Sequence, residues 1–281
     1  MAYHRINNYT SIARPLDPGF PTNKAVMILM PIGAALGAIA AWMNGVDGVG
    51  IFQQALNFLL IVFGSWALAR DLNPDDHTAA FIAIAAGVLA AFIVSSPGLL
   101  VVFATLGLVR IVNRTTGLAA RKTDSVLLML LAILVIYSTA SPYFGLVAAL
   151  AFILDGSLKE PLRHQWIFAM VCLGGTIVYM VDHDIGISQI SVPDSLFEWL
   201  GLLFLLIFAL NTLLLKKVHS KGDVTGKRLD LNRVRGGMAV GLFAALQAII
   251  RPDEVVIIVA AIAGICIGMA VRKGFKAPVS S

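Results

Sequence analysis

The sequence predicts an all-α protein, a polytopic bundle of about ten transmembrane helices. Of the 281 residues, 58% are hydrophobic and only 13% are charged, where a soluble domain carries about 25% charged residues. The mean hydropathy is +0.86. The apolar residues also fall in runs near the length of about 20 residues that a helix needs to cross a bilayer. A soluble fold, a disordered chain and a disulfide scaffold are excluded on these grounds.

The ten predicted spans are the successive apolar runs of the chain, and polar segments separate most of them. In order they are Ala25–Met43, Ile51–Ala69, Thr78–Val94, Gly98–Val112, Ser125–Ala140, Pro142–Leu154, Gln165–Met180, Ser195–Leu215, Arg235–Ile250 and Glu254–Val271. The fourth and sixth are short, and 13 residues rise only about 20 Å against roughly 30 Å of hydrocarbon. One hairpin, 78–112 or 125–154, could therefore be re-entrant, which would leave eight crossings.

The cations alternate between the loops in a way that predicts the orientation. Only Arg251 lies on one side, so 20 of the 21 Lys and Arg residues lie on the other. Such a bias is typical of cytoplasmic loops, so we expect both termini to face the cytoplasm. In a bacterial cell the membrane would then be the plasma or inner membrane. The basic segments are 1–24, 70–77, 110–124, 155–164, 216–235 and 272–281.

This orientation divides the chain into three parts and predicts which lipids it contacts. We expect a cytoplasmic N-terminal segment over 1–24, a single transmembrane domain over 25–271 and a cytoplasmic tail over 272–281. The expected partner is a bilayer with anionic headgroups on the cytoplasmic side. The net charge of +5 is then explained by the loops, and no nucleic-acid partner is predicted.

The most polar segment is the predicted anion site. It follows the fourth span, and two guanidinium groups one helical turn apart could hold a phosphate at the membrane surface. The alternative is a basic loop that touches anionic lipid headgroups. The residues of this site are Arg110, Asn113, Arg114, Arg121 and Lys122.

Two further polar loops are predicted on the same side. The first contains Asp71, Asp75, Asp76 and His77, which could bind a divalent metal. The segment 73–76 also has the pattern of a helix start, with Asn73 as the N-cap, and this interpretation is favoured. The second loop is 155–164. If the three loops converge, acids and bases would meet at the cytoplasmic surface, but the sequence predicts neither a metal site nor a cofactor.

Inside the spans the polar residues are neutral, and no ionisable residue falls near a span centre. Proton relays usually use an intramembrane carboxylate or histidine, so a proton pump is disfavoured. Asn57 and Asn211 either bond between helices, which is the commoner case, or line the path of an uncharged solute.

Pairs of glycines four residues apart occur in three predicted spans and let helices approach closely. Contacts within one chain are the favoured explanation, and a homo-oligomer is left open. The pairs are Gly33 with Gly37, Gly237 with Gly241, and Gly264 with Gly268.

Three classes of function remain. A transporter or permease of a small or lipid-like solute is favoured. In length and span count the chain resembles the drug/metabolite transporter superfamily, although none of its motifs occurs here. The alternatives are a membrane-embedded enzyme acting on a phosphorylated lipid at the cytoplasmic face and a non-catalytic membrane assembly partner. Catalysis is therefore disfavoured without being excluded.

Overall fold

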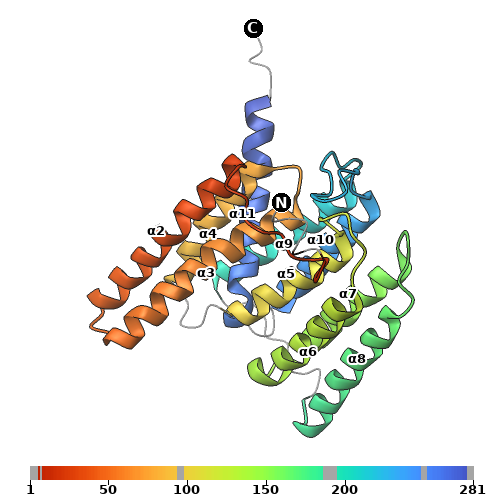
Figure 1. Cartoon of the computed structure of the whole chain (residues 1–281). Helices are drawn as coiled ribbons and strands as arrows, with labels where there is room; N and C mark the ends of the chain where they lie inside the picture. Colours follow the sequence, from red (N-terminus) through yellow and green to blue (C-terminus); the bar gives the residue numbers. More distant parts are fainter. Residues whose placement is uncertain (1–5, 7, 94–97, 186–194, 248–251, 277–281) are drawn as a thin grey trace.

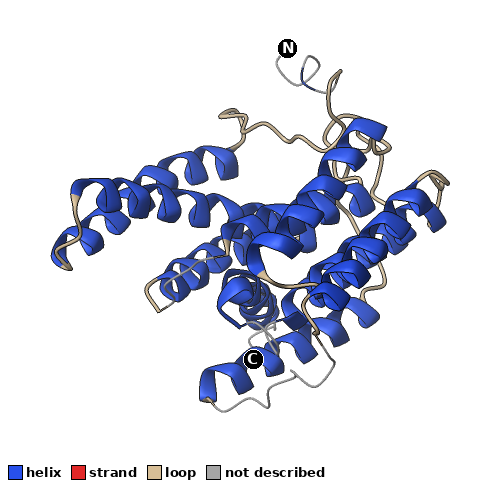
Figure 2. Ribbon diagram, turned by 90° about the horizontal axis from the view of Figure 1, so that it is seen from below, coloured by secondary structure: helices blue, strands red, loops and turns tan. Residues whose placement is uncertain are grey.

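The structure, a computed structural model, describes residues 6, 8–93, 98–185, 195–247 and 252–276. The secondary structure of these residues is helical (Figure 2). Their β-structure is limited to an isolated bridge between Lys221 and Arg228. The helices are α2 (Pro21–Met43), α3 (Gly48–Leu72), α4 (His77–Ala91), α5 (Leu99–Asn113), α6 (Lys122–Thr139), α7 (Tyr143–Ser157), α8 (Gln165–Asp182), α9 (Leu196–Leu214), α10 (Leu231–Leu246) and α11 (Pro252–Lys276) (Figure 1).

The all-helical fold class is confirmed, because each predicted span corresponds to one helix and the ends agree to within five residues. Among the described residues, α2, α3, α6, α8 and α9 are long and apolar enough to cross a membrane. Helices α4, α5 and α7 have 15 residues each, about 22 Å of rise. A count of ten crossings therefore stays a prediction, and so does the re-entrant alternative.

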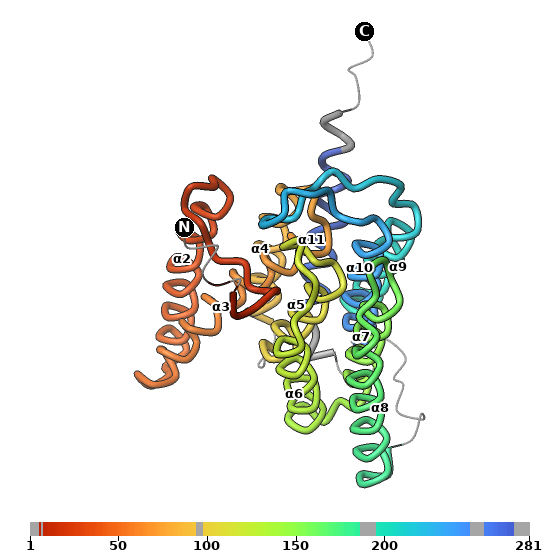
Figure 3. Tube along the Cα trace, turned by 45° about the vertical axis from the view of Figure 1, so that its right-hand side comes forward, coloured from red at the N-terminus to blue at the C-terminus, as the bar shows by residue number. Residues whose placement is uncertain are grey.

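The helices form a bundle with α5 near its centre. Helix α5 packs against α3, α7 and α10, while α6, α7 and α8 pack on one another beside it (Figure 3). Helices α2 and α3 form a hairpin that extends to one side in Figure 1. Helix α11 packs against α4 and α9. The long helices expose large apolar side chains, among them Trp42, Phe52 and Phe197, as expected of surfaces that face lipid rather than water.

The segment 73–76 leads into a helix, as its pattern predicts, but the capping residue differs. The predicted N-cap was Asn73, whereas Asp76 accepts hydrogen bonds from the backbone of Thr78 and Ala79 at the start of α4. The cap falls three residues later because segment 73–75 forms a turn before α4 begins. Asp76 is therefore a structural residue of the helix start.

The predicted glycine pairs pack within the chain. A Cβ atom added to Gly264 or Gly268 of α11 would overlap the backbone of Ala83 or Ala79 of α4. In α2, a Cβ atom added to Gly37 would lie 2.6 Å from the backbone carbonyl of Gln54 in α3, and one added to Gly33 would lie 2.6 Å from the side chain of Val62. Small residues thus let these helices approach as the pattern predicts, and a homo-oligomer is not needed to explain them.

Candidate functional site at the basic end of the bundle

The predicted cytoplasmic segments meet at one end of the bundle, which we call the basic end. It consists of the N-terminal segment 8–20 and of the loops 73–76, 114–121, 158–164 and 215–230. Ion pairs connect these segments to one another and to the adjoining helix ends. Convergence of this kind depends on tertiary packing, so the sequence could state it only as a condition.

The first cluster of the basic end surrounds Asp71, a fully buried carboxylate in the last turn of α3. One carboxylate oxygen lies 2.7 Å from Nη1 of Arg14, and the other lies 2.7 Å from Nε of Arg110. Asn113 donates its side-chain amide to the backbone carbonyl of Asp71. Arg110 also donates to the carbonyl of Ile12, so this cluster joins the N-terminal segment to α3 and α5.

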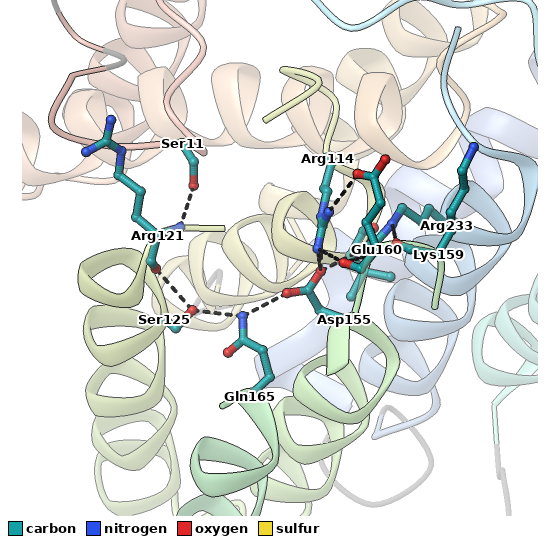
Figure 4. Close-up of polar contacts among 10 residues, drawn as sticks. Ser11, Arg114, Arg121, Ser125, Asp155, Lys159, Glu160, Gln165 and Arg233 are labelled. Carbon is teal, nitrogen blue, oxygen red and sulfur yellow. Dashed lines mark hydrogen bonds and ion pairs between the residues drawn. The ribbon is translucent and has the colours of Figure 1, made fainter. Parts of the chain in front are cut away.

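The second cluster surrounds Asp155, which is also fully buried (Figure 4). Arg114 and Arg233 each place a guanidinium nitrogen 2.8 Å from the same carboxylate oxygen. Gln165 donates to the other oxygen at 2.8 Å and to the hydroxyl of Ser125 at 2.9 Å. The cluster joins α6, α7, α8 and α10 to the loop that follows α5.

The N-terminal segment is held down by Ser11. Its backbone N–H and its hydroxyl donate to one carboxylate oxygen of Asp124, at 2.7 and 2.6 Å. Its carbonyl accepts a hydrogen bond from the hydroxyl of Thr116, and its hydroxyl accepts one from the backbone of Arg121. Segment 8–20 is therefore part of the folded basic end.

The loop 215–230 carries a hairpin, which we define as residues 220–229. Backbone N–H groups of Asp223 and Val224 donate to the carbonyls of Thr115 and Thr116. Asp223 also pairs with Arg14 at 2.6 Å. The hairpin thus closes over the loop that follows α5.

The contacts of the basic end favour the charged forms of Arg14 and Asp75. Burial alone would lower the pKa of Arg14, but the carboxylates of Asp71 and Asp223 outweigh it and raise this pKa above its ordinary value. Burial alone would raise the pKa of Asp75, but hydrogen bonds from the Ser220 side chain and the backbone of His219 outweigh it and lower this pKa.

The predicted anion-site residues all lie at the basic end, but the structure divides them. Arg110 and Asn113 belong to the Asp71 cluster, whereas Arg114 belongs to the Asp155 cluster. Arg121 and Lys122 are exposed at the start of α6. The two guanidinium groups bind carboxylates of the chain itself, and their binding of an external anion stays a prediction.

A cavity of about 270 Å³ lies between the ends of α3, α9, α10 and α11. Its wall is mainly apolar, and Met238 and Met269 contribute to it. Asp75 and Lys216 supply charges at the loop end, and Asn211 supplies an amide.

The two asparagines of the predicted solute path are not brought together. Asn211 lines the cavity, and so does Leu72. Asn57 precedes Leu72 by 15 residues in α3, about 22 Å along that helix. The side-chain amide of Asn57 instead donates a hydrogen bond within α3, to the side-chain oxygen of Gln54 at 3.4 Å.

A second, more polar pocket of about 220 Å³ lies on the other side of the turn 73–76. Arg14, Arg70 and Lys221 line it, together with Asp223. Pro74 lines both this pocket and the apolar cavity. The basic end therefore offers an apolar site and a cationic site that share one wall residue.

Several residues of these sites escaped the sequence analysis. The sequence places Asp71 and Asp155 only within polar loops, and its pattern gives Arg14, Gln165 and Arg233 no distinct role. The available signal was a carboxylate in the last turns of an apolar helix, as at Asp71 and Asp155. Burying such a group is costly unless a cation pairs with it. A cationic partner from elsewhere in the chain could therefore have been expected for each carboxylate.

Among the described residues, no group of three or more His, Cys, Asp or Glu side chains is arranged to hold a metal ion. Comparisons with protein-family models, curated proteins and solved structures found no match. A functional assignment therefore depends on the geometry of the basic end.

Proposed function

We propose that the chain is a multi-spanning membrane protein with both termini on the cytoplasmic side. Five long apolar helices support membrane insertion. The gathering of cationic segments at one end of the bundle supports the orientation, since Lys and Arg are enriched in cytoplasmic loops. Arg14 near the N-terminus and Arg272 near the C-terminus both bond to residues of this end, Asp71 and Asp75.

We propose further that the protein is a permease for a lipid-like solute. The cavity beside Asn211 carries this proposal, because its apolar wall and its polar loop end match a molecule with a hydrocarbon part and a polar head. The cavity lies among helices that would stand in the membrane, where such a molecule is already concentrated.

Transport can be tested with purified protein in liposomes that contain a fluorescent phospholipid. Dithionite quenches only the outer leaflet, so a permease for lipid-like molecules makes additional label accessible. We expect Met238→Trp, which fills the cavity, to abolish this gain. The matched control is Met170→Trp on the exposed face of α8, which should keep it.

Met238 is buried, so its replacement could also disturb folding. Asn211→Leu removes the amide from the cavity wall while keeping the number and branching of the side-chain heavy atoms, and it provides a second variant. A thermal melt of each variant in detergent separates loss of fold from loss of transport. Lipid movement equal to that of empty liposomes in the folded wild type would refute the proposal.

A membrane-embedded enzyme acting on a phosphorylated lipid is the second candidate. The observation that favours it is the convergence of loops 73–76, 114–121 and 158–164 at the basic end. Against it, the buried carboxylates Asp71 and Asp155 each bind two arginines, which leaves neither poised as a general base. Turnover of a phosphorylated lipid by the purified protein would favour this candidate over the permease.

A further inference from the structure

The titratable side chains that line the polar pocket beside Pro74 come from four separate parts of the chain. Arg14 comes from the N-terminal segment, Arg70 from the last turn of α3, His77 from the start of α4, and Lys221 and Asp223 from the hairpin 220–229. The two hairpin residues and His77 are exposed, so the pocket opens at the surface of the basic end.

The charges that line the pocket favour an anion. Three cationic side chains, Arg14, Arg70 and Lys221, face one carboxylate, that of Asp223. Asp223 already binds Arg14 through both of its oxygens, at 2.6 and 3.1 Å. Among the described residues that line the pocket, three cations and one carboxylate give a net positive formal charge.

The neighbouring carboxylates face donors of the chain itself. Asp75 accepts from the backbone of His219 and from the backbone and hydroxyl of Ser220. Asp76 accepts from the backbone at the start of α4 and lies 3.8 Å from Arg272. These contacts reduce the repulsion that the acids of the turn would exert on an incoming anion.

Arg14 is held in a fixed position before any ligand arrives. Asp71 and Asp223 fix its guanidinium from two sides, so little side-chain entropy is lost when an anion binds beside it. Arg70 stacks over the ring of Trp66, with 5.4 Å between the guanidinium carbon and the ring centroid. Planar guanidinium groups and a lysine are the residues that bind phosphate groups most often.

We propose that this pocket binds a phosphate group, either as the head of an anionic lipid or as free phosphate. The site differs from the predicted one, since Arg110 and Arg114 do not line it. The inference deepens the proposed function, because the pocket shares Pro74 with the apolar cavity. A lipid-like solute with its hydrocarbon part in the cavity would then have a phosphorylated head.

The test uses the full chain in nanodiscs of neutral phosphatidylcholine, titrated with inorganic phosphate in a calorimeter at constant ionic strength. We expect binding to the wild type and a loss of affinity of at least about tenfold, or about 1.4 kcal/mol, in Lys221→Gln. The matched control is Lys227→Gln, which removes the same charge from an exposed position of the same hairpin outside the pocket. Its affinity should equal that of the wild type.

A second arm repeats the titration in nanodiscs that contain phosphatidic acid. Weaker apparent binding of phosphate in these nanodiscs assigns the site to a lipid headgroup, and unchanged binding assigns it to free phosphate; either result supports the proposal. Absence of phosphate binding in the first arm, or equal losses in Lys221→Gln and Lys227→Gln, would overturn it.

Failure of this inference can be told apart from failure of the proposed function. The phosphate titration does not involve the apolar cavity, and the movement of fluorescent lipid does not require a phosphate site. If Met238→Trp loses lipid movement and the wild type binds no phosphate, the permease proposal is supported and the phosphate-site proposal is refuted.

Discussion

At the scale of single residues, two buried carboxylates organise the basic end. Asp71 and Asp155 each lie in the last turns of an apolar helix and each bind two arginines. An isolated ion in such a position would be strongly destabilising, whereas a paired and hydrogen-bonded one is tolerated. Both carboxylates are therefore structural residues, and their loss would remove the ion-pair partner of Arg110 or of Arg233.

Replacing Asp155 with Asn should destabilise the protein by about 3–5 kcal/mol, the usual cost of removing one partner of a buried ion pair. Arg233 would remain buried without its ion-pair partner, and Arg114 would keep only the exposed carboxylate of Glu160, 3.6 Å away. The measurement is the thermal midpoint of the purified protein in detergent. Asp182→Asn, at an exposed position of α8, is the control and should leave the midpoint unchanged; a similar midpoint for both variants would contradict the account.

The pKa of Asp75 predicts a loosening of the hairpin in acid. This pKa is lower in the folded protein than in the unfolded chain. The ionised carboxylate of Asp75 therefore stabilises the fold fully at pH values above about 3.9, the ordinary pKa of an aspartate. This stabilisation is lost as the pH falls through the pKa of the folded state. We expect the backbone N–H of Ser220 to lose protection from hydrogen exchange on acidification below about pH 4.

The variant Asp75→Asn provides the control for this pH effect. It should show reduced protection of Ser220 already at neutral pH and little further change in acid, after correction for the intrinsic exchange rate. A pH dependence in the variant as steep as that of the wild type would show that another group is responsible.

At the scale of helices, the sequence predicts where the helices lie in the chain, but it does not predict which helices and side chains pack together. The ten apolar runs could be located because apolar length is a local property. Helix α10 begins at Leu231, four residues before the predicted Arg235. The polar residues Asn232 and Arg233 made this start hard to locate, because the buried Arg233 is satisfied by Asp155 and by backbone carbonyls of other segments. Such a pairing depends on tertiary contact and leaves no periodic trace in the sequence.

The close packing of α11 on α4 yields a prediction at this scale. Gly264→Leu should destabilise the bundle by at least about 1–3 kcal/mol, because overpacking forces backbones apart and the new side chain would overlap the backbone of Ala83. Gly174→Leu in α8 is the matched control, since a Cβ atom there meets nothing within 4 Å. The thermal midpoint in detergent should fall for the first variant and stay near that of the wild type for the second.

At the scale of the whole molecule, the bundle is asymmetric. Cationic segments and both described chain ends gather at one end, and the long helices expose apolar side chains along their length. The apolar cavity and the cationic pocket both lie at this end. Composition predicted the basic loops, but only the folded chain shows that a cavity and a pocket lie side by side around Pro74.

The orientation in the membrane is the claim on which the proposed sites depend, and single cysteines test it most directly. The native Cys172 and Cys266 are buried and can be replaced by Ala to give a background without reactive thiols. Cysteines would then be placed at exposed positions of the basic end (Arg121, Lys227) and of the other helix ends (Asn44, Asp182).

A membrane-impermeant maleimide applied to vesicles of known sidedness reports which face each cysteine occupies. With both termini in the cytoplasm, the cysteines at 121 and 227 should react only from the cytoplasmic face and those at 44 and 182 only from the opposite face. Labelling of 121 and 227 from opposite faces would contradict this orientation.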